Sequence, residues 1–122
     1  MALFRALTAS SGGGEKPTLL YQGSFTSGSI NVDSSGYAKL LFVCGSSTSY
    51  TDYTLVKKVS PSVDAIIAGG TGTDFMRGYC VRITDSALTI LYSWYSNDCP
   101  IYAIYGYNSD NIDLSDIVSD YP

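Results

Sequence analysis

Carboxylates, aromatic rings and three cysteines are the side chains of this chain that could carry chemistry, because its 122 residues include no histidine. The lack of histidine excludes Ser-His and Cys-His nucleophile pairs, histidine metal sites and the commonest general base. The cysteines, Cys44, Cys80 and Cys99, have no Cys-x-x-Cys spacing. We therefore predict no metal site and no cofactor.

Aspartates at or near expected loops are the remaining candidates for hydrolytic chemistry. Two carboxyl groups that face each other across a cleft can cleave a glycosidic bond. Aspartate in a turn more commonly hydrogen-bonds to the nearby backbone, so we expect a protein that is not an enzyme. A polysaccharide depolymerase remains the least favoured alternative, with these candidates: Asp52, Asp64, Asp74, Asp85 and Asp98.

A glycine-rich stretch, IIAGGTGTDFM, follows an apolar run, as a dinucleotide-binding loop does. That fingerprint requires G-x-G-x-x-G at the start of a helix, but Phe75 stands at the third glycine position and β-like residues follow. A Walker loop is also excluded, since no Gly-Lys-Ser/Thr occurs. The pattern favours a glycine-rich loop of a β-domain.

Aromatic residues are the positive signal for binding, with 11 tyrosines and one tryptophan. Strand alternation in LYSWY predicts that Tyr92 and Trp94 share one face and that Tyr95 lies on the other. Exposed aromatic rings stack on sugars or form protein interfaces, whereas core packing is the alternative explanation. The candidate residues for glycan or host contact are Trp94, Tyr92, Tyr95, Tyr50 and Tyr53.

The elements that must position these residues are short strands. Charged residues make up 15% of the chain, against roughly 25% in an average domain, and glutamate occurs once. Turn signals at intervals of about ten residues predict an all-β fold, an antiparallel β-sandwich of the jelly-roll kind with about seven to nine strands. The expected strands span 18–23, 28–32, 37–45, 50–59, 63–70, 79–84, 88–95 and 100–107.

Individual strands carry further expectations. The segment 37–45 is nearly continuously apolar, which predicts that both of its faces are covered. In IYAIYGY, alternation predicts one shared face for Ile101, Ala103, Tyr105 and Tyr107.

Three regions follow from composition. Residues 17–107 form the predicted β-sandwich domain, and residues 1–16 combine an apolar segment with the flexible linker SSGGG. Residues 108–122 form an acidic tail with four aspartates and no basic residue. A short helix, an extended arm and a disordered tail all remain open for it. In the first segment, a peg that attaches to a particle and a frayed terminus are equal alternatives, and the attachment candidates are Leu3, Phe4 and Leu7.

Charge and hydropathy exclude several classes of partner. The net charge is −4, and outside the acidic tail the seven acidic and seven basic residues balance. A nucleic-acid binder needs a basic face, but the one adjacent basic pair is Lys57-Lys58, so we expect no nucleic-acid partner. No stretch approaches the roughly 20 apolar residues of a membrane span, so we expect no membrane partner either. We expect folding in a reducing cytosol, although a Cys80–Cys99 bridge remains an alternative.

The order of these segments resembles small β-domains of tailed-bacteriophage virion proteins. The opening LYQG and TSGSI, at Leu20–Gly23 and Thr26–Ile30, and the closing IYGY, at Ile104–Tyr107, carry the resemblance. It covers about residues 17–107. This chain departs from a typical tail fibre because it lacks a long N-terminal shaft and adds the acidic tail.

The resemblance implies a non-enzymatic virion protein that folds in the host cytoplasm before assembly. Relatives of this kind occur at tail-fibre tips and on head fibres, often as trimers. The expected partners are other virion proteins, two further copies of the chain and a host-surface glycan. The alternative is a capsid decoration or head-fibre protein with a purely structural role, in which the same tyrosines fill subunit interfaces.

Overall fold

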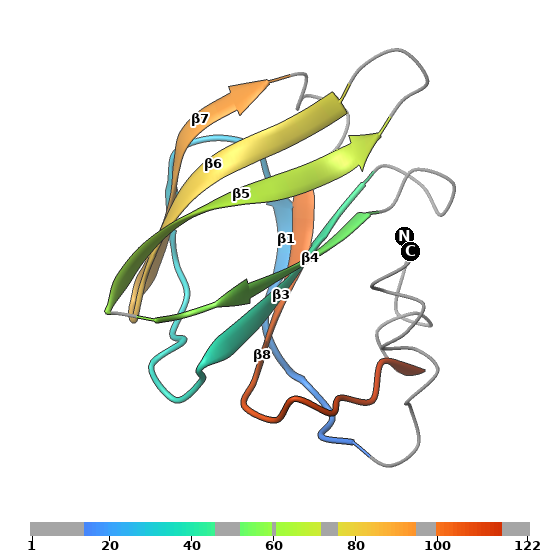
Figure 1. Cartoon of the computed structure of the whole chain (residues 1–122). Coiled ribbons are helices and arrows are strands. Elements are labelled where there is room, and N and C mark those ends of the chain that lie inside the picture. Colours follow the sequence, from blue (N-terminus) through green and yellow to red (C-terminus); the bar gives the residue numbers. More distant parts are fainter. Residues whose placement is uncertain (1–13, 46–51, 60, 72–75, 95–99, 116–122) are drawn as a thin grey trace.

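The computed structural model describes residues 14–45, 52–59, 61–71, 76–94 and 100–115, which build two antiparallel sheets packed face to face (Figure 1). This arrangement confirms the predicted antiparallel β-sandwich. Its strands are β1 (Thr18–Phe25), β2 (Ser29–Asn31), β3 (Lys39–Cys44), β4 (Asp52–Lys57), β5 (Ser62–Thr71), β6 (Met76–Thr84), β7 (Ala87–Trp94) and β8 (Ile101–Tyr107).

The first sheet has the order β1-β8-β3-β4 and the second has the order β2-β7-β6-β5. The first strand therefore pairs with the last and the second strand with the seventh, the nested pairing that a jelly roll has on its outer strands. The inner strands form two simple hairpins, β3–β4 and β5–β6, each within one sheet. The chain crosses between the sheets from β1 to β2, from β2 to β3, from β4 to β5 and from β7 to β8.

The turns lie where the turn-forming residues predict them. Gly28, between β1 and β2, has a φ of 82°, a conformation that costs glycine little and other residues more. Asp85 and Ser86 connect β6 to β7. In the loop after β2, the carboxylate of Asp33 accepts hydrogen bonds from the amide and hydroxyl of Ser35, and these bonds lower its pKa.

The space between the sheets holds the main core, which is apolar and closely packed. Phe42 and Ile104 enter it from the first sheet, and Ile67 and Tyr79 enter it from the second. Each such side chain contributes roughly 1.5–3 kcal/mol by leaving water, so the core is the principal source of stability.

Strand β3 is buried on both faces, as its continuous apolar run predicts. Leu40 and Phe42 point into the main core, while Leu41 and Val43 point to the opposite face of the sheet. There they join a second apolar group, here named the outer cluster: Leu41, Val43, Ala103, Tyr105, Tyr107, Ile112 and Leu114.

The outer cluster is completed by the segment after β8. Ile112 and Leu114 are fully buried there, so residues 108–115 pack onto the first sheet instead of separating from it at residue 107. The acidic residues of this segment point outward, and Asp110 pairs with Lys39. The remainder of the predicted acidic tail, residues 116–122, lies outside the described residues.

Glu15 fastens this segment to the other end of the domain, and Figure 1 shows the two ends of the described chain side by side. Its amide donates to the carbonyl of Asn111 (2.9 Å), and its carbonyl accepts from the amide of Asp113 (2.8 Å). Its carboxylate accepts from the amides of Asn108 (2.8 Å) and Ser109 (2.6 Å). Glu15 and residues 108–113 are therefore joined by hydrogen bonds to each other beside the predicted domain 17–107. The attachment candidates Leu3, Phe4 and Leu7 lie outside the described residues.

One predicted face was wrong. Ala103, Tyr105 and Tyr107 do share the outer cluster, but Ile101 points into the main core. The pairing with β3 slips between Val43 and Cys44, where Cys44 pairs with Ile101 and leaves one extra residue on β8. Such a bulge shifts strand alternation by one position.

Candidate functional site

The outward face of the second sheet carries the predicted aromatic pair, and strand pairing arranges it in rows. In one row Ile66, Cys80 and Tyr92 lie across β5, β6 and β7. The next row towards one end of the strands pairs Gly78 with Trp94. The next row towards the other end joins Asp64, Arg82, Thr89 and Ser29.

Tyr92 and Trp94 are neighbours on this face, as alternation predicts. Their ring centroids are 5.9 Å apart and their planes differ by 34°, so the two rings form a nearly continuous surface. Tyr92 is 65% exposed. Pairing with β6 slips between Cys80 and Val81, which leaves Leu91 as an extra residue that is itself 45% exposed.

Gly78 supports the indole of Trp94. A side chain at this position would place its Cβ 2.7 Å from a ring carbon of Trp94 and 2.9 Å from the carbonyl oxygen of Ile67. The glycine therefore lets the indole approach the backbone of β6 closely. This contact leaves Trp94 partly buried.

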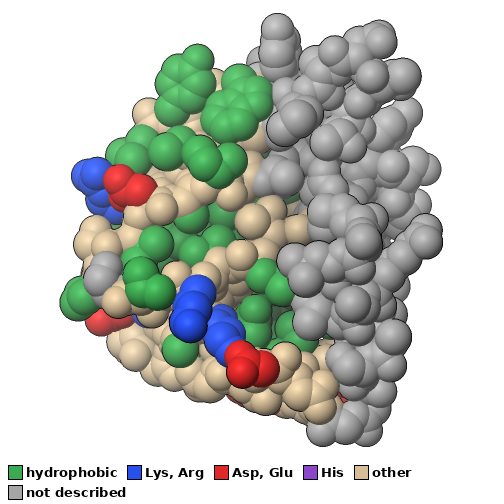
Figure 2. Space-filling model, in the orientation of Figure 1, with side chains coloured by type: hydrophobic (Ala, Val, Ile, Leu, Met, Phe, Trp, Pro, Cys, Tyr) green, Lys and Arg blue, Asp and Glu red, His purple; other side chains and the backbone are tan. Residues whose placement is uncertain are grey.

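Three exposed apolar side chains and the partly buried Trp94 gather here into what we name the aromatic patch, which comprises Ile66, Leu91, Tyr92 and Trp94. Ile66 is 61% exposed on β5. Figure 2 shows hydrophobic side chains gathered over β5 to β7, beside a pair of one basic and one acidic side chain. An exposed apolar group of this kind is characteristic of a binding surface.

Asp64 and Arg82 form the ion pair that borders the patch. Nε of Arg82 lies 2.9 Å from one carboxylate oxygen of Asp64, and Nη2 lies 3.0 Å from the other. This hydrogen bonding lowers the pKa of Asp64 and raises the pKa of Arg82. Both groups stay ionised at neutral pH, and both are about half exposed (48% and 51%).

The other predicted contact residues do not join the patch. Tyr53 lies on β4 of the first sheet, where it packs against the outer cluster. Tyr50 and Tyr95 lie outside the described residues. Sequence reasoning missed Asp64, Arg82 and Gly78 as parts of this surface, because each becomes a neighbour of the aromatic pair only through strand pairing.

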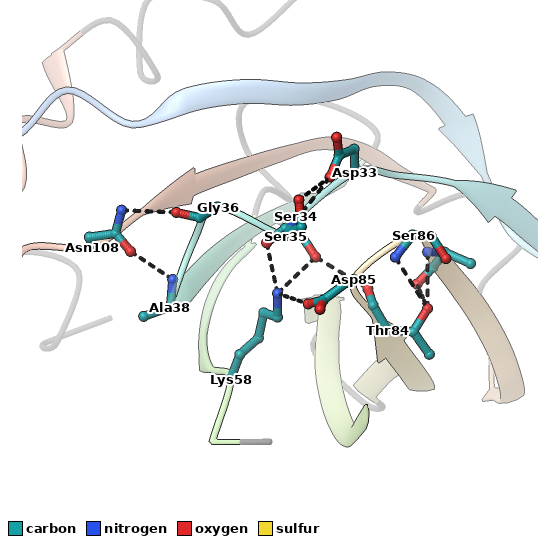
Figure 3. Close-up of polar contacts among 11 residues, drawn as sticks. Asp33, Ser34, Ser35, Gly36, Ala38, Lys58, Thr84, Asp85, Ser86 and Asn108 are labelled. Carbon is teal, nitrogen blue, oxygen red and sulfur yellow. Dashed lines mark hydrogen bonds and ion pairs between the residues drawn. The ribbon is translucent and has the colours of Figure 1, made fainter. Parts of the chain in front are cut away.

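A second polar group closes one end of the sandwich and links both sheets (Figure 3). The Lys58 side chain is 6% exposed, and its Nζ donates to the carbonyl of Ser34 (2.7 Å), the hydroxyl of Ser34 (3.1 Å) and the carboxylate of Asp85 (2.8 Å). The hydroxyl of Ser34 donates in turn to the carbonyl of Thr84 (3.2 Å). The three donors of the ammonium group thus have three acceptors.

This arrangement resembles a Ser-Lys nucleophile pair but lacks its chemistry. A lysine that activates serine must accept the serine proton, but Nζ of Lys58 is instead a donor to three acceptors, one of which is the Ser34 hydroxyl itself. Ser34 is 1% exposed, so a substrate has no access to its hydroxyl. The group is a structural tie between the β2–β3 loop, the end of β4 and the β6–β7 turn.

The aspartates considered for hydrolysis form no catalytic pair among the described side chains. Asp64 and Asp85 each bind a basic side chain, and the side chains of Asp52, Asp74 and Asp98 are outside the described set. The described residues contain no group of three metal-binding side chains. Cys80 is a partly buried free thiol. No helix in the described ranges has the length and hydropathy to cross a membrane.

Comparisons with protein-family models, with curated proteins and with solved structures found no match to this chain.

Proposed function

We propose that this chain is a non-enzymatic binding module that contacts a host-surface glycan through the aromatic patch. The observation that carries the proposal is the Tyr92–Trp94 pair on the outward face of the second sheet, in which Tyr92 is exposed and Trp94 is partly buried against Gly78. The β-sandwich supplies a rigid support for the two rings.

Sugar recognition follows from the nature of the two rings. The C–H faces of a pyranose are apolar and stack on aromatic faces, while its hydroxyl groups need polar partners at the edge of the ring. Tyrosine and tryptophan supply a large contact area at low entropic cost because each has two side-chain torsions. The Asp64–Arg82 pair provides donors and acceptors one row away.

The proposed setting is the virion of a tailed bacteriophage, at a fibre or tail tip. The resemblance of residues 17–107 to virion β-domains supports it. In this setting the chain assembles with other virion proteins, as a homotrimer, and presents the second sheet to the host.

Fluorescence titration tests the proposal, because Trp94 is the one tryptophan in the chain. Polysaccharide extracted from the host surface should quench or shift the Trp94 emission in a saturable manner. Tyr92→Ala should weaken binding by roughly 1–3 kcal/mol, the range that stacking on one aromatic side chain contributes in other binding sites. Trp94→Ala should weaken binding by a similar amount. Its binding is measured by calorimetry, because this variant has no tryptophan emission.

Leu19→Ala is the control. Leu19 is an exposed apolar residue (45% exposed), but it lies on β1 of the first sheet, away from the patch. The substitution should leave binding unchanged. If the Tyr92→Ala and Trp94→Ala variants bind the polysaccharide as tightly as the unaltered protein does, the aromatic patch is not the binding site.

A capsid decoration or head-fibre protein is the second candidate, and one observation favours it. Ile66, the most exposed residue of the patch apart from Tyr92, is aliphatic and lies on β5, an edge strand of its sheet. Aliphatic side chains at a sheet edge suit a protein interface better than a sugar. If the patch is a subunit interface, Ile66→Asp dissociates the assembled oligomer in light scattering, and glycans leave Trp94 emission unchanged.

A further inference from the structure

The charges around the aromatic patch indicate what kind of glycan it can bind, an inference that rests on the proposed function. Among the side chains that the structure describes on the outward face of the second sheet, Asp64 and Arg82 are the charged ones; the side chain of Arg77 on β6 is outside this set. They bind each other through two hydrogen bonds. The charges of the described side chains on this face therefore cancel.

A carboxylated, sulfated or phosphorylated sugar would find no uncompensated cation among the described side chains of this surface. Asp64 already balances the charge of Arg82, and its carboxylate would repel an anion that approached the remaining N–H groups of the guanidinium. The net charge of −4 on the chain adds a further repulsion. The surface thus discriminates against anionic glycans.

Hydroxyl groups fit the same surface well. The guanidinium of Arg82 keeps N–H groups that do not point to Asp64, and the carboxylate oxygens of Asp64 keep free lone pairs. Beside them the hydroxyls of Ser29 and Thr89 lie 2.9 Å apart, and each can donate or accept. This polar row is about 7 Å along the strands from Tyr92, or two residues of rise, which is within reach of the edge of a stacked pyranose.

We propose that the ligand is an uncharged glycan, stacked on Tyr92 and Trp94 with its hydroxyls over the Asp64–Arg82 pair. Asp64 acts here as a specificity residue as well as a hydrogen-bond acceptor. Because it occupies Arg82, it prevents that guanidinium from recruiting anionic sugars.

The test uses the full chain and two matched series of hexose oligosaccharides, one neutral and one with the C6 hydroxymethyl groups oxidised to carboxylates. Trp94 emission reports binding. The neutral series should bind at least about tenfold more tightly, the effect of one charge-assisted hydrogen bond that is lost. Its affinity should change less than about twofold between low and high salt, since no charge is screened.

The variant Asp64→Asn provides the sharper result. It removes the competing carboxylate and retains a similar shape, so the carboxylated series should gain at least about tenfold in affinity through the released Arg82. The double variant Asp64→Asn with Arg82→Gln should lose that gain. Circular dichroism of each variant verifies the fold.

Two outcomes contradict the inference, and they can be told apart. Preference of the unaltered protein for the carboxylated series overturns the uncharged-glycan assignment but leaves the proposed function standing. Binding of neither series, nor of host polysaccharide, overturns the proposed function and this inference together.

Discussion

At the scale of single residues, the environment of each tyrosine decides what it does. Tyr79 is fully buried in the main core, Tyr107 is buried in the outer cluster, and Tyr92 is 65% exposed on the second sheet. The large tyrosine content is therefore divided between stability and surface chemistry. An exposed ring beside a well-packed core costs the fold little and is available for a ligand.

Tyr107 gives a prediction for alkaline pH. Burial, together with the charges of Asp110 and Glu15, raises its pKa from 10.0 to about 12. The raised pKa means that the folded state favours the neutral phenol, so this contribution to stability is complete below pH 10 and is lost as the pH rises towards 12. Urea unfolding at pH 9 to 12 should show a steeper decline for the unaltered protein than for Tyr107→Phe. Identical declines would contradict the burial of the phenol.

Lys58 gives a prediction about polar burial. Lys58→Met leaves the carbonyl and hydroxyl of Ser34 and the carboxylate of Asp85 without their shared donor. We expect a loss of about 1–3 kcal/mol in the free energy of unfolding, measured with urea at pH 7. The control is Lys57→Met at the exposed neighbour, which should change stability by less than about 0.5 kcal/mol. Equal effects of the two substitutions would show that the network contributes nothing.

At the scale of elements, the segment after β8 packs on the first sheet, whereas the sequence left its conformation open. Its aspartates dominate the sequence pattern and predict an acidic tail, whereas Ile112 and Leu114 between them cover the first sheet. The closing strand of the fold thus continues into a strap that Glu15 fastens.

Leu114→Ala tests whether this strap is part of the stable domain. Leu114 is fully buried, so truncation should cost about 2–5 kcal/mol, measured by urea unfolding. Leu19→Ala, at a residue 45% exposed, should cost much less. A loss for Leu114→Ala no greater than that of the control would mean that the segment does not pack on the sheet in solution.

Sequence periodicity was sufficient to predict where the strands lie, since turn residues mark their ends and apolar runs mark their buried faces. It was also sufficient to place Tyr92 and Trp94 on one face. It could not predict the slips beside Leu91 and before Ala103, because a bulge depends on the partner strand. The Asp64–Arg82 contact requires the β5–β6 register for the same reason.

At the scale of the whole molecule, the two sheets have different outward faces. The first sheet is covered by the segment after β8, which buries the outer cluster. The second sheet presents Ile66, Leu91 and Tyr92 to solvent. This asymmetry leaves one broad apolar surface with a neutral polar border, and the proposed binding function depends on it.

The most direct test of the central claim is to locate the sugar on the protein. Nuclear Overhauser contacts should be measured between a bound neutral oligosaccharide and the aromatic protons of the full chain. The account predicts contacts between the sugar C–H groups and the rings of Tyr92 and Trp94, with the adjacent hydroxyls near Arg82. Contacts at Tyr53 on the first sheet, or a bound sugar with none at Tyr92 and Trp94, would contradict it.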